Sequence, residues 1–573
     1  MGMFSRKLSF GFMGFLVGAI LCSPALAIEV SPLVLDAMEE ELSRNHQAIS
    51  MEGYESPYFI GYTVRDTQES FIQARFGALT ESTRERKRVA YVEVRVGDYQ
   101  RDNTLDKEGQ SYDEMSLMQA DVRLPTDNDL PAIRRALWLL TDQRYKEALT
   151  AYHRVKGSRV YRKEDSAGAF SREEPVKHMS EGKIRLLDEK KWSGVARQLS
   201  AVLMDGEGIL DGSVEITHQI EVRYQVNSEG TRLMTQKNLI GVHITASTLA
   251  EDGSVLDYGI NHYAPGAEQL PNLGALTESA VEVRAHLVAL RKAPTLAPYT
   301  GPAILMPRAA GVLFHEAIGH RLEGHRQEDP EEGRTFAGQV GETVLPTFLT
   351  VKDDPTLSTY EGTPLNGHYE FDDEGVSSKP VVLIEKGVLR NYLMSRKPIE
   401  GASSSNGHGR SAGIASPVGR MGNLRVEAEG SVTLEELKKQ LIKEVRTAGK
   451  PFGLIIGDVT GGSTNTMNYG YQAFKGGASQ VFKVDVETGA LELVRGVEIV
   501  GTPLSSINKV VAASEESGVF NGYCGAESGY VPVGTISPAL LLREIELQRS
   551  MRSRQKGPIL PAPKKLRGGP NSP

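Results

Sequence analysis

The sequence predicts an α+β protein with two domains, on three observations. Alternating polar and apolar residues predict strands at residues 58–64 and 92–96 and long strands between residues 214 and 263. A Pro-rich connection at residues 294–302 separates these strands from a Gly-rich second half. A chain of 573 residues is also longer than one hydrophobic core requires. We therefore expect an N-terminal mixed α/β domain with a large antiparallel sheet at residues 28–293. A C-terminal β-rich domain of twisted sheets, carrying a short helix, should follow at residues 303–550.

The first 27 residues predict an export signal. Arg6 and Lys7 precede a short apolar stretch, and Ala25-Leu26-Ala27 has the small-residue pattern of a cleavage site. The apolar stretch is too short for a bilayer span, and no later segment is long and apolar enough to cross a membrane. We expect cleavage near Ala27 and an exported chain, periplasmic or secreted, without a membrane span.

The order of elements in the first domain follows from periodicity. Apolar residues at helical spacing predict helices near residues 33–42, 131–156, 193–203 and 277–292. Alternation predicts strands over residues 58–64, 92–96, 214–226, 231–246 and 255–263.

In the second domain, the sequence predicts one clear amphipathic helix. Thr433 and Glu436 form a capping-box pattern at its start, and Gly449 ends it. Strand-like segments lie at residues 381–384, 454–459, 480–486 and 491–500. Residues 551–573 are basic and rich in Pro and Gly, which predicts a disordered tail.

The charge pattern argues against nucleic acid as a partner. The formal net charge is -8, whereas affinity for phosphates depends on clustered Lys and Arg. The densest basic run, residues 84–88, contains a glutamate and precedes strand-like residues, so we expect it on a solvated strand edge.

Cysteine usage singles out one residue. If the signal is cleaved, Cys22 leaves with it and Cys524 is the one cysteine of the mature chain, so no internal disulfide can form. A buried inert residue, a reactive thiol and a metal ligand are the three explanations of such a cysteine.

The segment His315-Glu316-Ala317-Ile318-Gly319-His320 has the residue types of a hydrolytic metal centre. Two imidazoles can bind a metal, and a carboxylate beside them can act as a base. The histidines are five residues apart, however, and a straight α-helix would turn them about 140° away from each other. Either a π-bulge or a helix that ends at Gly319 could bring them together.

Two residues beyond this segment are further candidate donors. Glu323 and His325 lie near Gly324, where the alternative is a capping or solvated role at the helix exit.

The segment from Gly311 to Gly324 resembles the HExxxH signature of the TldD/PmbA metalloproteases, in its catalytic TldD form. Further blocks follow in the family's order: Phe336-Ala337-Gly338, Asp372-Asp373-Glu374-Gly375, Asn406-Gly407-His408-Gly409-Arg410 and Tyr523-Cys524-Gly525. The resemblance is strong over residues 301–537 and weak over the first half. It departs from the family in the export signal and in His325, where the family often has an acidic residue.

The resemblance implies a zinc-dependent peptidase. Zinc would be bound by His315, His320 and Cys524, with Glu316 as general base. Family members cleave unfolded or small peptides, commonly as a dimer of a motif-bearing and a motif-lacking subunit, so a homo- or heterodimer is expected.

Other residues and other functions stay open at this stage. His408 and Arg410 could bind the substrate, either at an oxyanion or at a carboxylate. A peptide-binding or assembly subunit with a structural zinc is the main alternative. Gly409-Arg410-Ser411-Ala412-Gly413 fits the pattern G-x-S-x-G of serine hydrolases, but the apolar strand and the helix that this elbow needs are not predicted around it.

Overall fold

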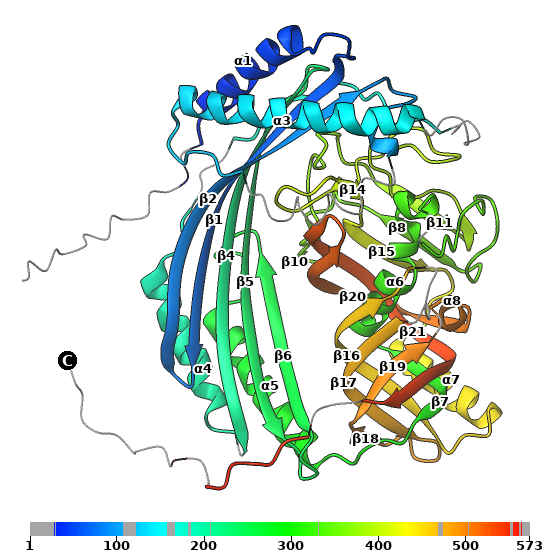
Figure 1. The fold of residues 1–573 in the computed structure, drawn as a ribbon. Coiled ribbons are helices and arrows are strands. Elements are labelled where there is room, and N and C mark those ends of the chain that lie inside the picture. Colours follow the sequence, from blue (N-terminus) through cyan, green and yellow to red (C-terminus); the bar gives the residue numbers. More distant parts are fainter. Residues whose placement is uncertain are drawn as a thin grey trace, which may run out of the picture.

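The computed structural model describes residues 28, 30–106, 122–157, 167–181, 185–206, 208–329, 332–467, 474–501, 503–550, 554–560 and 563. The predicted export signal and most of the predicted tail lie outside these residues. Two sheets face each other and helices cover their outer sides (Figure 1), so the α+β prediction is confirmed. Among the described residues, no helix is both long enough and apolar enough to cross a membrane.

The first sheet consists of long strands in the order β2-β1-β4-β5-β3, with β6 on β5. Its strands are β1 (Pro57–Arg75), β2 (Ala78–Val96), β3 (Lys177–Met179), β4 (Ile209–Asn227), β5 (Arg232–Leu249) and β6 (Val255–Ala264). All neighbours pair antiparallel except β3 with β5. The large antiparallel sheet predicted from alternation is therefore present.

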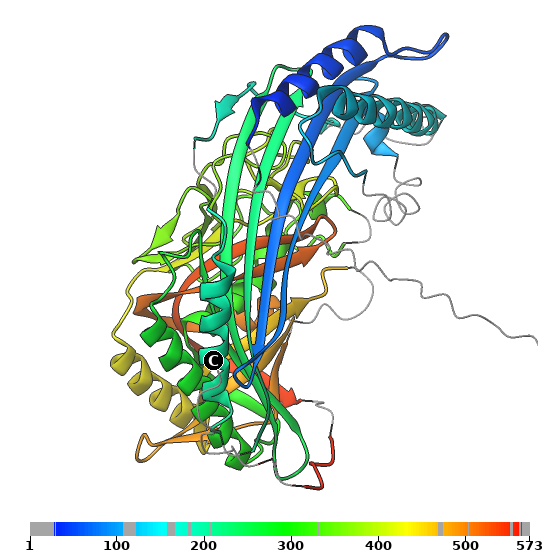
Figure 2. The same ribbon diagram turned by 90° about the vertical axis from the view of Figure 1, so that its left-hand side faces the viewer.

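Helices cover one face of this sheet, as the turned view in Figure 2 shows. They are α1 (Pro32–Ala48), α3 (Leu130–Gly157), α4 (Glu189–Leu203) and α5 (Leu273–Lys292), with the short 3-10 helix η1 (Asn103–Leu105). Alternate residues of β4, such as Ile216, Ile220 and Val222, are buried in the clusters that these helices complete. The residues between them, including Glu221 and Arg223, face the C-terminal half instead.

The basic run at residues 84–88 does lie on an edge strand, but the prediction that it is solvated is wrong. Arg86 and Arg88 both donate to the Asp66 carboxylate, at 2.8 and 2.6 Å for the closest nitrogens, and Arg88 is 1% exposed. The carboxylate of the neighbouring strand provides the compensation that a buried guanidinium requires.

The second sheet has 11 strands and mixed pairing. They are β7 (Tyr299–Leu305), β8 (Leu349–Asp353), β11 (Val381–Glu385), β12 (Val388–Leu389), β15 (Asn423–Ala428), β16 (Phe452–Thr464), β17 (Phe474–Asp485), β18 (Leu491–Val494), β19 (Val497–Gly501), β20 (Val510–Ala526) and β21 (Gly529–Arg549). Two small hairpins pair β9 (Thr359–Tyr360) with β10 (Thr363–Pro364) and β13 (Gly409–Arg410) with β14 (Val418–Gly419).

Three segments differ from the sequence predictions in detail. The strand predicted at 491–500 is two strands, because Gly496 has a φ of +83° between them. Strand β7 begins at Tyr299, inside the predicted connection, because it pairs with β16 and β21. Within the predicted tail, Gln555 donates its backbone N–H to Gly253 in the β5–β6 turn, so part of that segment is ordered against the sheet.

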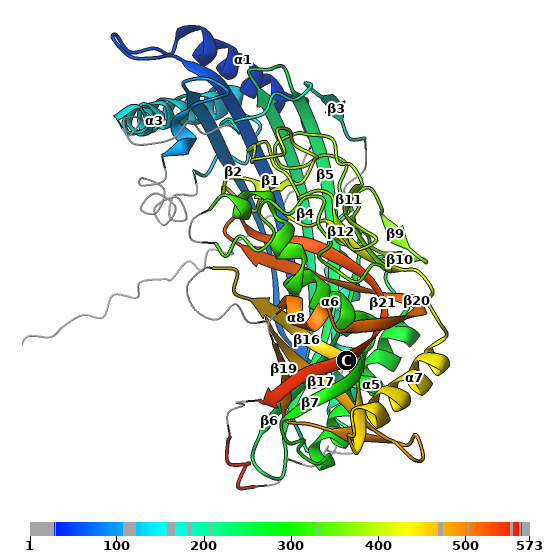
Figure 3. The ribbon, with the colours of Figure 1, turned by 90° about the vertical axis from the view of Figure 1, so that its right-hand side faces the viewer.

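The helices of the second half differ in how deeply they are buried, and Figure 3 shows where they lie. They are α6 (Pro307–Ala317), η3 (Gly319–Leu322), η4 (Gly324–Gln327), α7 (Leu434–Thr447) and α8 (Pro503–Ile507). The α7 helix starts at the Thr433 cap, as predicted, and buries Leu437, Leu441 and Val445 against the sheet. In α6, every residue from Ala309 to Ala317 is buried, so this helix forms the centre of the second core.

Candidate metal centre

The segment with the two histidines changes its helical form between them. The α-helix α6 ends at Ala317, Ile318 takes φ -117° and ψ -51°, and the 3-10 helix η3 starts at Gly319. A Cβ at Gly319 would lie 2.0 Å from the Met421 sulfur, so any larger residue at this joint would force the Met421 side chain to move. Of the two arrangements that the five-residue spacing left open, the chain adopts the one in which the helix ends.

This joint brings the imidazoles of His315 and His320 together. Their ring centroids are 5.0 Å apart and the rings are nearly perpendicular, at 86°. His315 comes from the last turn of α6 and His320 from η3.

The third donor comes from a distant part of the chain. Cys524 lies on β20, which forms a hairpin with β21 across the core, and its sulfur is 3.4 Å from His320 Nε2. One ligand atom from each of His315, His320 and Cys524 lies within 4.8 Å of the others. Cys524 is 4% exposed, and the Nδ1 atom of His315 is buried without a hydrogen-bond partner among the described residues.

The three donors also perturb each other's pKa values. Burial favours a neutral Cys524 thiol, but His320 and His315 outweigh burial and hold its pKa well below the ordinary value. Burial likewise opposes a charge on His320, and the Glu323 carboxylate with Cys524 raises its pKa well above the ordinary value. The pocket therefore favours a thiolate, which is the form of cysteine that binds metals.

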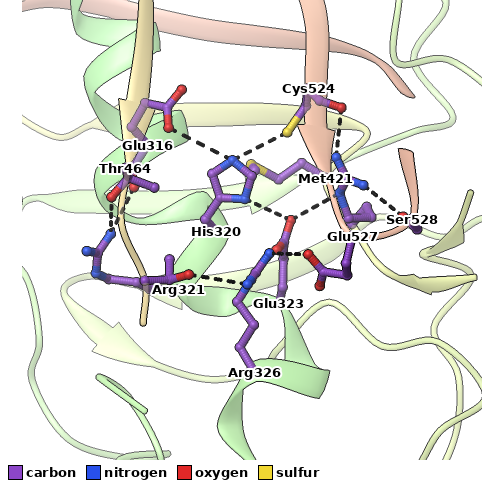
Figure 4. Close-up of polar contacts among 12 residues, drawn as sticks. Glu316, His320, Arg321, Glu323, Arg326, Met421, Thr464, Cys524, Glu527 and Ser528 are labelled. Atoms are coloured by element: carbon purple, nitrogen blue, oxygen red, sulfur yellow. Dashed lines mark hydrogen bonds and ion pairs between the residues drawn. The ribbon is translucent and has the colours of Figure 1, made fainter. Parts of the chain in front are cut away.

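A network of charged residues orients His320 from its other side (Figure 4). Glu323 Oε1 lies 3.2 Å from His320 Nδ1, while Arg326 Nε donates to Glu323 Oε2 at 2.7 Å. Burial raises the pKa of Glu323, but His320 and Arg326 lower it to about 2. Arg420 donates to the Cys524 carbonyl at 2.8 Å and so links the network to β20. A carboxylate behind a histidine is the usual arrangement around metal-binding imidazoles.

Glu323 and His325 therefore have roles other than the donor positions considered from sequence. Glu323 contacts the His320 nitrogen that faces away from Cys524, and the His325 ring pairs with Glu527. Both side chains are thus engaged away from the three converging donor atoms.

Glu316 faces a cavity of about 260 Å³ beside these donors. Its Oε2 atom lies 3.9 Å from His320 Nε2. The cavity is lined by residues of both sheets, among them Tyr258 and Tyr263 of β6, Asp458 and Gly462 of β16, and Phe520 and Tyr523 of β20. The site therefore lies between the two halves of the chain.

His408 and Arg410, predicted to bind the substrate, do not line this cavity. His408 is fully buried, and its ring nitrogens lie near Asn406 and 3.2 Å from Asp353. Arg410 is 4% exposed and lines a second, larger cavity of about 680 Å³. Tyr523 lines both cavities.

The serine hydrolase alternative has no support in the geometry around Ser411. Gly409 and Arg410 form a two-residue strand, and the Ser411 hydroxyl accepts from Arg65 at 3.3 Å. No histidine donates to or accepts from this hydroxyl among the described residues, whereas a serine nucleophile needs a base within hydrogen-bond reach.

Sequence reasoning missed three features of the site: Glu323 as the partner of His320, the arginines behind it, and the wall formed by β6. The spacing of His320 and Glu323, three residues apart, could have indicated the first. The wall from β6 depends on how the two sheets face each other, which local patterns do not specify.

Known proteins resemble the chain in sequence and in fold. Residues 298–549 match the family model of the PmbA/TldA metallopeptidase C-terminal domain. A metalloprotease of Methanocaldococcus jannaschii is 29% identical over 334 residues, which are 58% of this chain and 68% of that protein. A metalloprotease TldD homologue of Haemophilus influenzae is 31% identical over 261 residues, or 44% of this chain and 49% of that protein. A zinc metalloprotease TldD homologue of Saccharolobus solfataricus is 24% identical over 252 residues, or 43% and 51%.

The fold resembles that of TldE from Thermococcus kodakarensis, with a TM-score of 0.59 over 89% of this chain and 100% of that one, at 14% identity. At this identity the likeness concerns the fold alone. The sequence matches cover the half that carries the three converging donors. Residues 298–549 therefore resemble the C-terminal domain of the PmbA/TldA metallopeptidases, and the chain's sequence relatives are metalloproteases.

Proposed function

We propose that this chain is an exported zinc-dependent peptidase of the catalytic TldD type, with zinc bound by His315, His320 and Cys524. The observation that carries the proposal is the convergence of these three buried donors, whose ligand atoms lie within 4.8 Å of one another. Two imidazoles and a thiolate suit zinc, and a buried His315 nitrogen without a protein partner suits a metal ligand. The Saccharolobus relative is itself a zinc metalloprotease by name.

Zinc at such a site supplies Lewis acidity, which lowers the pKa of water towards about 7 and polarises a peptide carbonyl. Proton transfer depends on residues of the chain itself. Glu316 lies beside His315 and faces the cavity, so its carboxylate can accept a proton from the attacking water and deliver it to the leaving amine. Glu323 fixes the ring of His320, and the low pKa of Glu323 keeps its carboxylate charged for that contact.

A structural zinc in a non-catalytic peptide-binding subunit is the second candidate function. A structural site fills all four zinc positions with protein donors. Because Glu323 contacts the far side of His320 and His325 pairs with Glu527, neither is placed as the fourth donor. Three donors and one open position favour catalysis.

Zinc content and peptide cleavage, measured side by side, test the proposal. We expect one zinc per chain in the mature wild type and cleavage of a quenched-fluorescent unstructured peptide. Glu316→Gln should retain zinc and lose at least about a hundredfold in kcat, because the proton acceptor is gone. Cys524→Ser should lose most of the zinc. A wild type without zinc, or a fully active Glu316→Gln enzyme that still binds zinc, would contradict the proposal.

Export and assembly complete the proposal. The n-region, apolar stretch and Ala25-Leu26-Ala27 site support cleavage near Ala27, which N-terminal sequencing of the processed chain would test.

Peptides and unfolded chains are the proposed substrates, and a second family subunit is the proposed partner. Light scattering of the purified protein, alone and with such a subunit, would test the partner.

A further inference from the structure

The larger cavity, of about 680 Å³, lies between the first sheet and the loops of the second half. Residues of β4 and β5 form one wall, and Arg410, Asn366 and Tyr369 belong to the other. Tyr523 connects this cavity with the one beside the metal centre, since its ring lines both. Its neighbour Cys524 points to the opposite face of β20, towards the histidines.

The cations that line this cavity are not all paired with carboxylates. In the register of the first sheet, Lys237 on β5 lies opposite Glu221 on β4. Glu221 pairs instead with Arg65, at 2.9 Å. Burial raises the pKa of Asp373, but Arg65 and Arg223 lower it below the ordinary value, and both arginines pair with this carboxylate. Both carboxylates are therefore paired with the two arginines of the sheet.

Asp372 makes no ion pair with the cations of this cavity among the described residues. Burial raises its pKa to about 7, and its oxygens already accept three backbone N–H groups. Three more carboxylates lie at the rim and are exposed to solvent: Glu69, Glu181 and Glu370.

Lys87, Lys237 and Arg410 have no carboxylate partner within 4.0 Å among the described residues, and Lys87 lies apart from the other two on the edge strand β2. Lys237 donates to the Asn366 carbonyl at 3.5 Å, and Arg410 donates to the carbonyls of Met421 and Pro532. Burial, followed by the nearby charge of Arg410, lowers the pKa of Lys237 to about 7. Two neighbouring cations that share a cavity and make no direct ion pair can bind an anion.

We propose that Lys237 and Arg410 form a subsite that binds the C-terminal carboxylate of a short peptide substrate. The proposal rests on the proposed peptidase function, because every unmodified linear peptide ends in one carboxylate. The aromatic side chains of Tyr523 and Tyr530 line the same cavity and offer apolar contact to the last residues of such a peptide.

This subsite predicts a cleavage position counted from the C-terminus. A peptide that is anchored by its carboxylate presents the same bond to the metal centre however long its N-terminal part is. In a series of N-acetylated oligoalanines of increasing length, the released C-terminal fragment should therefore keep one length, as mass spectrometry would show.

A binding experiment tests the subsite without requiring turnover. The probes are an N-acetylated oligoalanine acid and the same peptide as its C-terminal amide, titrated calorimetrically into the Glu316→Gln protein. We expect the acid to bind at least about tenfold more tightly, because the two cations attract a carboxylate and not a neutral amide. In Glu316→Gln with Lys237→Met, this preference should fall below about threefold.

Lys87→Met is the matched control. Lys87 lies in the same row of the sheet, opposite Thr67, at about 14 Å from Lys237 by strand spacing, and lines the same cavity. Its substitution should leave the preference intact. An amidated peptide with a C-terminal aspartate separates a chain-end carboxylate from a side-chain carboxylate, and it should bind like the plain amide.

The outcomes separate this proposal from the proposed function. Equal binding of acid and amide to the Glu316→Gln protein, or a preference that survives Lys237→Met, would overturn the subsite even if the wild type cleaves peptides. A preference for the acid that depends on Lys237 would support it even if the wild type cleaves none. Equal Tm values of the Lys237→Met and Lys87→Met proteins would exclude misfolding as the cause.

Discussion

At the scale of single residues, the contact between Glu323 and His320 bears most directly on metal binding. Glu323→Gln removes the charge behind the imidazole while keeping the side chain's shape. We expect zinc affinity to fall about 10–100-fold, because the ring loses part of its basicity and its fixed orientation. Competition with a chromogenic chelator would measure the change.

The control for this substitution is Glu332→Gln. Glu332 pairs with the same Arg326 but does not contact His320. A similar loss of zinc from both variants would show that Arg326, and not the contact with His320, determines the affinity.

At the scale of elements, the joint between α6 and η3 determines whether the two histidines meet. In Gly319→Ala the added methyl would overlap the Met421 sulfur, and Met421 is 1% exposed. We expect the free energy of unfolding of this variant to fall by about 2–3 kcal/mol, because buried overlap forces backbone shifts. Zinc binding should weaken as well. Adding Met421→Ala should restore zinc binding by making room. Denaturant titration and zinc content are the measurements.

Gly194→Ala serves as the comparison for the joint. Gly194 lies within α4, and a Cβ there would meet nothing within 4 Å. This substitution should stabilise the protein by about 0.5–1 kcal/mol, since alanine is the better helix former. Equal effects of the two alanines would refute the steric role of Gly319.

At the scale of the whole molecule, a pair of buried carboxyl groups makes stability depend on pH. Asp372 and Glu374 lie in a loop that contacts the first sheet, and burial raises the pKa of both, that of Asp372 to about 7. The folded protein thus holds protons that the unfolded chain releases above about pH 4. Their stabilising effect is present below that pH and is lost as the pH rises through about 7. The charged groups around the pair are Asp373, Arg396 and Glu93.

The free energy of unfolding should therefore fall by on the order of 1–3 kcal/mol between pH 5 and pH 8. Glu374→Gln mimics the protonated carboxyl group, so its stability should change less over this range. Denaturant titrations at pH 5, 6, 7 and 8 would measure both proteins. Parallel pH profiles would contradict the assignment to this pair.

Local features of the fold were predicted from the sequence more completely than contacts between distant residues. The helices and the antiparallel strands follow from local periodicity, and α7 begins at the predicted Thr433 cap. His315 and His320 were candidates from their own segment, whereas the family resemblance assigned Cys524 as the third ligand, because no spacing rule connects it to residues so far away. The buried Arg88 and the contribution of β6 to the cavity were not predicted, since both depend on partners from other parts of the chain. Long-range pairing of charges leaves no local pattern in a sequence.

The distance along the chain between His320 and Cys524 has a consequence for the order of synthesis. The two residues are separated by 204 positions, and Cys524 reaches the histidines only when the β20–β21 hairpin has formed across the core. A nascent chain that has not yet been extended through this hairpin has two of the three donors. The proposed peptidase would thus complete its set of three donors only after this hairpin has been synthesised and has paired, so that an unfinished chain would lack the full metal site.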